Sequence, residues 1–422
     1  MANSIQFEEG ALQPTPVCGR VCNFLGAGFS AATKYELPTS VGFLSETVPF
    51  YSQNEKNEPE VKPFGYATTR RDFPGLLERI KEQYGPLEEL NLEDVLTSLH
   101  VRSTGVGRSW ERTIPMVGSP LSIKELRHDY DTLIAYIQRR LQLQGDSIPE
   151  CPLVNKSITT LKRQDSIVTL NYDYILELYL HAKTEESEAN PRLDLLQKTI
   201  GPPSLGGDSG PTMMFDANEY PNTGFLVKLH GSIDWVTCPN ANCPNNSFVH
   251  SFAGWFKNQP KNGLNPRCIH CATAPEMVIV PPIATKEFEK IPKLGLMWQQ
   301  AYEALRTASR WTFIGVSFAP TDFHLRALIH AATRDANQMN AKDDSKGQIC
   351  VVGKDFCGAK KSACKLIDAF YPSLKKEYLD GSRSVAIFDS VENYLNSVEI
   401  TDVNREDQRL KKKNLSQNIQ SP

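Results

Sequence analysis

The stretch VCNFLGAGFSAAT, residues 21–33, decides how this chain begins to fold and raises the question of what its glycine turn holds. The five residues VCNFL are mostly apolar, and they run directly into Gly-Ala-Gly and then into small, helix-compatible residues. This order predicts a buried strand, a tight turn and the start of a helix. In such a unit Gly26 and Gly28 allow the backbone to approach a pyrophosphate, while Ala31 takes the place of a third glycine. The motif alone fits a ligand-free turn equally well.

Composition and charge set the class of protein. The chain has 422 residues, long enough for one large domain with insertions or for two to three smaller units. Its 46 Lys and Arg residues nearly balance 49 Asp and Glu residues, so no overall charge favours nucleic acid or a membrane surface. Without a long apolar segment or a secretion signal in MANSIQFEEG, we expect a cytoplasmic protein that binds no membrane. The basic run RLKKK, 409–413, is typical of a solvated tail, and no nucleic-acid module is visible.

Buried-strand candidates recur along the chain and alternate with helical periodicity. They are VCNFL (21–25), SIVTL (166–170), FLVKL (225–229), MVIV (277–280), WTFIGV (311–316), ICVV (349–352) and VAIF (385–388). Strands separated by helices imply an α/β fold with a Rossmann-like, doubly wound and mostly parallel sheet. We therefore expect one domain over residues 1–403, followed by a polar, disordered tail at 404–422.

The stretch between the first two strands is too long for a simple crossover. Residues 45–160 are dominated by helical patterns such as LEELNLEDVLTSLH and IKELRHDYDTLIAYIQRRLQ. We expect them to form a helical insertion or lid within the domain.

Polar side chains follow two further strands at the point where each strand ends. Asn171 and Asp173 come after 166–170, and His230, followed by Gly231, comes after 225–229. The carboxyl ends of parallel strands form the crevice in which such sheets bind ligands. A lone histidine or asparagine at such a place is more often structural. Three polar groups on strand ends together with the glycine turn favour a ligand site.

Four of the ten cysteines form two short pairs. Cys238 and Cys243 have four residues between them, and Cys268 and Cys271 have two. Two such pairs can close a tetrahedral, structural zinc site that holds together a polar module over 236–275. His250 and His270 are further possible ligands, although four cysteines suffice. Surface thiols, a disulfide and a module that has lost its metal are the alternatives.

These segments resemble the sirtuin family, which has a Rossmann-like NAD-binding fold and a zinc module. The matching segments are GAGFS (26–30), ELPTSVGFL (36–44), TLNYD (169–173) and LHGSIDW (229–235), and the resemblance spans roughly residues 20–360. It implies NAD as the substrate and structural Zn²⁺ at the four cysteines. It implies that Asn171 and His230 are catalytic. The cofactor-binding residues it implies are Gly26, Ala27, Gly28, Ser30, Asp173, Gly315, Ser317, Gly353 and Lys354.

Two departures from the sirtuin pattern indicate the chemistry. Leu170 stands in place of a glutamine, and EMVIVPPIATKEFEK stands where deacylating sirtuins carry a Phe-Gly-Glu segment for the acyl-lysine peptide. The NYD and LHGS.DW segments look like those of the sirtuin-like NAD hydrolases of bacterial antiphage systems. The resemblance thus implies an NAD⁺ glycohydrolase that depletes NAD in abortive infection. Protein deacylase, ADP-ribosyl transferase and non-catalytic NAD or ADP-ribose sensor are the alternatives.

Each candidate residue has an expected role. Cleavage of the nicotinamide–ribose bond needs a bent substrate, exclusion of bulk water and one placed nucleophile. Asn171 would orient the ribose hydroxyls or the water, and His230 would accept a proton. Asp173 would fix the nicotinamide-side loop, and Ser30 with the turn's N–H groups would hold phosphate.

The resemblance also implies partners. Family members commonly oligomerise or pair with a second protein, so we expect a homo-oligomer. We also expect a separately encoded partner such as a HerA-type hexameric ATPase or an Argonaute-like sensor.

Overall fold

A computed structural model describes most of the regular structure of the chain. The described residues are 20–33, 37, 39, 43–44, 72–103, 122–141, 151–161, 164–177, 179, 199–200, 226–247, 249–251, 267–280, 293–318, 322–340, 348–370 and 385–398. The expected tail at 404–422 lies outside these residues, as does most of ELPTSVGFL.

The centre of the molecule is a seven-stranded sheet in which every pair of neighbouring strands is parallel. Its strands are β1 (Val21–Leu25), β2 (Ser166–Thr169), β3 (Thr199–Ile200), β4 (Leu226–Lys228), β8 (Arg310–Ile314), β9 (Gln348–Val352) and β10 (Val385–Phe388). The spatial order is β10-β9-β8-β1-β2-β4-β3. With the short β3 set aside, this is the doubly wound Rossmann order 3-2-1-4-5-6. The predicted α/β fold class is confirmed.

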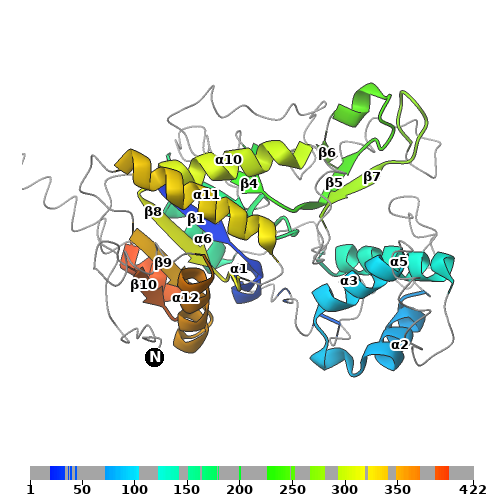
Figure 1. Cartoon of the computed structure of the whole chain (residues 1–422), viewed down its shortest axis with the longest axis horizontal. Helices are drawn as coiled ribbons and strands as arrows, with labels where there is room; N and C mark the ends of the chain where they lie inside the picture. Colours follow the sequence, from blue (N-terminus) through cyan, green and yellow to red (C-terminus); the bar gives the residue numbers. More distant parts are fainter. Residues whose placement is uncertain are drawn as a thin grey trace, which may run out of the picture.

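Helices cover both faces of this sheet. On β1, Cys22 and Phe24 point to one apolar cluster, whereas Leu25 belongs to the other, because successive strand residues alternate between faces. The first cluster is completed by α10 (Lys293–Thr307), α11 (Phe323–Asn340) and α12 (Phe356–Phe370). Figure 1 shows α10 and α11 lying across the sheet. The second cluster includes α6 (Pro152–Thr159) and the helical residues 391–398. Burial on both sides explains why the strands read as continuous apolar runs.

A layer of three helices lies beside the sheet, in the chain between β1 and β2 (Figure 1). It consists of α2 (Asp72–Tyr84), α3 (Leu92–Ser103) and α5 (Ile123–Leu141), with a short 3₁₀ turn at Leu87–Glu89. Arg79 on α2 makes two hydrogen bonds to the buried Asp129 on α5, and Ser122 and Glu125 form a capping box at the start of α5. The apolar residues of this layer belong to the same cluster as the second face of the sheet. No helix in the described ranges combines the length and apolar character that crossing a bilayer requires.

A second, antiparallel sheet follows the end of β4. It contains β5 (Gly231–Thr237), β6 (His250–Ser251) and β7 (Glu276–Ile279), in the order β6-β5-β7. The stretch MVIV was expected among the strands of a mostly parallel sheet, but it pairs with β5 instead. Sequence reasoning missed β5 and β6, because the polar Ser232 and Asp234 interrupt the apolar pattern of β5 and β6 is only two residues long. Periodicity within one strand cannot show which strand it pairs with.

Candidate functional site

The glycine turn after β1 packs against the turn after β8. The N–H of Gly26 donates to Ile314 O (2.9 Å), and the N–H of Gly28 donates to Gly315 O (3.1 Å). A Cβ atom on Gly28 would lie 2.7 Å from Gly315 Cα, and one on Gly26 would lie 2.5 Å from Gly315 O. Gly315 itself has φ +63°, a conformation that favours glycine. The turn is therefore built by three glycines in close backbone contact, and the third comes from β8 rather than from position 31.

The helix that follows this turn is short. It is α1 (Ala27–Ala32), and its Phe29 N–H donates to Gly26 O. Ser30, which the sequence analysis assigned to phosphate, has its hydroxyl between two side chains. It donates to Asp173 Oδ2 (2.7 Å) and accepts from Asn171 Nδ2 (2.9 Å). In this structure Ser30 therefore joins α1 to the end of β2.

Asn171 and Asp173 are held by several hydrogen bonds at the end of β2. Asn171 Nδ2 also donates to Gly26 O (3.0 Å), and its backbone N–H donates to Thr169 Oγ1 (3.1 Å). Asp173 is buried and accepts from the backbone N–H of Ile175 through Oδ1 (3.2 Å). Within the described residues, no donor reaches Asn171 Oδ1. The side chain is thus locked through its nitrogen, and its oxygen is available to a ligand.

His230 follows β4 and lies between two aromatic rings. Its ring stacks on Tyr172, with centroids 6.1 Å apart, and lies 6.2 Å from the Trp298 ring of α10. The backbone carbonyl of His230 accepts from the N–H of Val280, whose own carbonyl accepts from Tyr172 Oη (2.6 Å). Burial, together with the carboxylates of Asp322 and Glu93, raises the pKa of Tyr172 well above its ordinary value. Tyr172 therefore stays protonated and keeps its hydrogen bond to Val280 O. This bond fixes the Tyr172 ring, against which the His230 ring stacks.

The backbone conformation after His230 explains why a glycine stands at position 231. Gly231 has φ +77°, and a Cβ atom there would lie 1.9 Å from Val278 O. At this residue the chain leaves the parallel sheet and enters β5 of the antiparallel sheet. His230 is thus the last residue before the chain leaves the parallel sheet and begins β5.

All eleven candidate residues line one cavity of about 470 Å³. They come from the carboxyl ends of five adjacent strands, β9, β8, β1, β2 and β4. The complete set is Gly26, Ala27, Gly28, Ser30, Asn171, Asp173, His230, Gly315, Ser317, Gly353 and Lys354. The chain leaves β1 toward β2 on one side and returns at β8 on the other, so the cavity lies at the topological switch point where such sheets bind ligands.

The sequence predicted a helical insertion or lid and a sirtuin-like segment at 36–44, but it did not show which of their residues face this cavity. Leu92 and Glu93 of α3 and Ile137 and Leu141 of α5 line it, together with Leu37, Thr39 and Phe43. Phe43 is held by α5, because Arg140 donates to its backbone carbonyl and lies over its ring at 5.1 Å. A helical pattern shows which residues share a face, but not which distant crevice that face covers.

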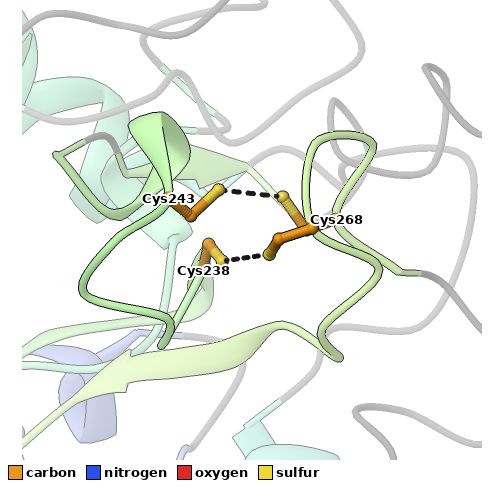
Figure 2. A group of neighbouring side chains, drawn as sticks. Cys238, Cys243 and Cys268 are labelled. Atoms are coloured by element: carbon orange, nitrogen blue, oxygen red, sulfur yellow. Dashed lines mark hydrogen bonds between the residues drawn. The ribbon is translucent and has the colours of Figure 1, made fainter.

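The cysteine cluster lies at the end of the antiparallel sheet, away from the cavity. Cys238 follows β5, and Cys268 and Cys271 precede β7. The Sγ atoms of Cys238 and Cys271 are 3.4 Å apart, those of Cys243 and Cys268 are 3.5 Å apart, and all four lie within 4.8 Å of one another. Figure 2 shows Cys243 facing Cys268 across a small gap, with Cys238 beside them.

This geometry fits a tetrahedral metal. Four thiolates about 2.3 Å from a zinc ion lie about 3.8 Å from one another. Hydrogen bonds with Thr273 lower the pKa of Cys271 to about 6, whereas burial raises the pKa of Cys238 and Cys243. A bound cation would favour the thiolate form of all of them. Asn245 donates to Cys268 Sγ (3.5 Å) as an outer support. The cluster could hold zinc through four cysteines, and in the described part of the chain neither His250 nor His270 belongs to it.

Comparison with known proteins gives distant structural likenesses. No protein-family model and no curated protein matches the chain. A structure solved to explain the mechanism and regulation of Sir2 enzymes shares 12% identity over 91% of this chain and 93% of its own, with a TM-score of 0.36. A Sir2 complex with a p53 peptide and NAD⁺ shares 11% identity over 91% and 94%, with a TM-score of 0.30. Both are Sir2 enzymes, the family that the sequence motifs resemble.

Proposed function

We propose that the protein is an NAD⁺ glycohydrolase that releases nicotinamide and ADP-ribose. The observation that carries this proposal is the convergence of all eleven candidate residues on one cavity at the switch point of the sheet. Asn171 and His230, the two candidate catalytic residues, line it from neighbouring strands β2 and β4.

The extent of the cavity favours a dinucleotide over a mononucleotide. Adjacent strands lie about 4.8 Å apart, so the row of strand ends from β9 to β4 spans about 19 Å. Lys354 and Ser317 supply a cation and a hydroxyl at the β9 and β8 end, where the adenine-side ribose and its phosphate would lie next to the glycine turn proposed for the pyrophosphate. Asp173, Asp322 and Glu93 also line the cavity, and the carboxylates of Asp322 and Glu93 act on Tyr172, whose ring stacks on His230. This distribution of charge suits a substrate with an anionic middle and a cationic ring at one end.

Each group then has one task. The Nδ2 atom of Asn171 is fixed by Gly26 O and Ser30 Oγ, so its Oδ1 can orient a ribose hydroxyl or the attacking water. His230, held by the rings of Tyr172 and Trp298, accepts the proton from that water or hydroxyl. Asp173 fixes the loop between them. The apolar wall of α3, α5 and Phe43 limits the access of bulk water to the bond that breaks.

The absence of a Phe-Gly-Glu segment for the acyl-lysine peptide favours hydrolysis over deacylation. At Val280, the N–H donates to His230 O and the carbonyl accepts from Tyr172 Oη, so this residue offers no open backbone group to a peptide strand. Water is therefore the nucleophile in the proposed reaction.

A single assay tests the proposal against its alternatives. Purified protein is incubated with NAD⁺, with and without an acetylated lysine peptide, and nicotinamide, ADP-ribose and acetylated ADP-ribose are separated by chromatography. The proposal predicts equal amounts of nicotinamide and ADP-ribose that do not depend on peptide. Release only with peptide would show a deacylase, transfer of ADP-ribose to protein would show a transferase, and binding without turnover would show a sensor.

We further propose that this activity depletes cellular NAD in antiphage defence. The proposal rests on the resemblance of the NYD and LHGS.DW segments to those of antiphage NAD hydrolases. It includes a homo-oligomer and a separately encoded partner, such as a HerA-type ATPase or an Argonaute-like sensor. Light scattering tests the oligomer, and a monomer that persists at high concentration would contradict it. Phage challenge of cells that express the native chain or the His230→Ala variant tests the biological role.

A further inference from the structure

Lys228 is a fully buried charge directly beneath the proposed site. It is the last residue of β4, two positions before His230, and its relative exposure is 0%. Its Nζ donates to Glu177 Oε1 (2.8 Å) and to the backbone carbonyl of Asp173. Glu177 is also buried, in the helical residues 175–177 that follow Asp173. Neither side chain lines the cavity.

The setting of this ion pair is apolar. Leu226 and Lys228 point to the same face of the sheet, because they lie two residues apart on β4. That face contains Leu226, Ile175 and Leu176 in one apolar cluster. A lysine in such a place is costly, since desolvation of its charge is repaid only by a close partner and additional hydrogen bonds. Two apolar side chains of similar size could fill this space without loss of stability, so stability alone does not explain the presence of the two charges.

The ion pair is the base of one continuous hydrogen-bond network. From Lys228 the network passes through Asp173 to Ser30, and from Ser30 to Asn171. Asn171 then reaches Gly26 O in the glycine turn. The ends of β4, β2 and β1 are thereby joined through a single set of contacts, in which Asn171 takes part directly. His230 follows Lys228 by two residues in the chain.

We propose that Lys228 and Glu177 are positioning residues for the cleavage reaction. The ammonium group holds the Asp173 carbonyl, and Glu177 holds the ammonium group, so the loop 170–177 is fixed relative to the end of β4. Asn171 Oδ1 and the His230 ring are thereby kept in one relative orientation. The inference rests on the proposed function for its catalytic part, whereas the fixing of the loop stands on the contacts themselves.

The test separates positioning from stability. Lys228→Met leaves Glu177 buried without its partner, whereas Lys228→Met with Glu177→Met replaces both charges by apolar groups of similar length. The double variant is expected to recover most of the melting temperature lost by the single variant, because paired apolar replacements of buried ion pairs are well tolerated. It should not recover the rate. We expect kcat for nicotinamide release to stay about 100-fold below the native value, with KM changed less than about threefold, as for a misplaced catalytic group.

Arg79→Met is the matched control. It removes a partner of the buried Asp129 between α2 and α5, away from the cavity-lining residues. It should lower the melting temperature with little effect on kcat. A double variant with native kcat would overturn the assignment of Lys228 and Glu177.

Hydrogen exchange gives a readout that does not depend on activity. In the double variant, amides of 170–177 and 26–33 should exchange faster, while those of β8 and β9 keep their native protection. Unchanged exchange in 170–177 would overturn the inference even if the rate falls. If the native protein releases no nicotinamide, the proposed function fails, and the exchange result alone decides whether the ion pair fixes the loop.

Discussion

The side-chain amide of Asn171 donates to the backbone carbonyl of Gly26 over 3.0 Å, which ties the end of β2 to the glycine turn after β1. Because the same nitrogen also reaches Ser30, one side chain supports the turn and also lines the cavity. The candidate catalytic residue and the glycine motif are therefore parts of one local structure.

Substitution of Asn171 should affect rate far more than stability. Asn171→Ala is expected to reduce nicotinamide release at least about 100-fold, since it removes a polar group aimed at the reacting atoms. Loss of its two side-chain hydrogen bonds should lower the free energy of unfolding by about 1–3 kcal/mol. Asn393→Ala, on the exposed side of 391–398, is the control and should leave the rate unchanged. Steady-state kinetics with urea unfolding measure both effects, and a native rate in Asn171→Ala would remove Asn171 from the mechanism.

Substitution of His230 should remove activity while NAD⁺ binding persists. His230→Ala and His230→Gln remove the imidazole that the proposed reaction uses as its general base, so each should reduce nicotinamide release at least about 100-fold. NAD⁺ binding, measured by calorimetry, should stay close to native. The exposed His128→Ala is the control and should keep the native rate. If His230→Gln keeps the native rate, the histidine is structural.

The close contact between the turns at Gly28 and Gly315 predicts that a side chain added at either glycine lowers NAD⁺ binding and activity together. Gly28→Val places a branched side chain against Gly315 Cα, and Gly315→Ala adds a Cβ atom 2.4 Å from Phe29 N at φ +63°. Overpacking of this kind costs about 1–3 kcal/mol, and NAD⁺ affinity should fall with stability. Gly295→Ala is the matched control, because its Cβ position in α10 is open. It should raise stability by up to about 1 kcal/mol and leave NAD⁺ binding unchanged. Native affinity in Gly28→Val would show that the turn does not shape the site.

The cysteine cluster should bind about one equivalent of zinc per chain. Cys268→Ser is expected to lower the zinc content, the melting temperature and the yield of folded protein, because metal binding is part of the folding free energy of such modules. The exposed Cys357→Ser should change none of these. Elemental analysis and thermal unfolding with and without a chelator measure the effect. Folded, active native protein without zinc would show that the cluster is not a metal site.

The sequence alone determined the class of fold and showed which candidate residues follow its strands. Alternation of apolar runs with helical periods predicted the doubly wound sheet, because strands that are buried on both faces consist of nearly continuous apolar residues. Polar residues directly after those runs predicted a site at the strand ends, and two cysteine pairs predicted the cluster. Each of these features consists of residues that are close together in the chain, so the sequence alone reveals it.

Only the tertiary structure decided which of those residues contact one another. It showed that Gly315 completes the glycine turn, that Ser30 lies between Asn171 and Asp173, and that MVIV pairs with β5. It also placed α3, α5 and Phe43 over the cavity and put Lys228 beside Glu177. Each of these is a contact between segments tens to hundreds of residues apart. Such contacts are selected by packing and by the pairing of buried polar groups, and neither leaves a periodic pattern in the local sequence.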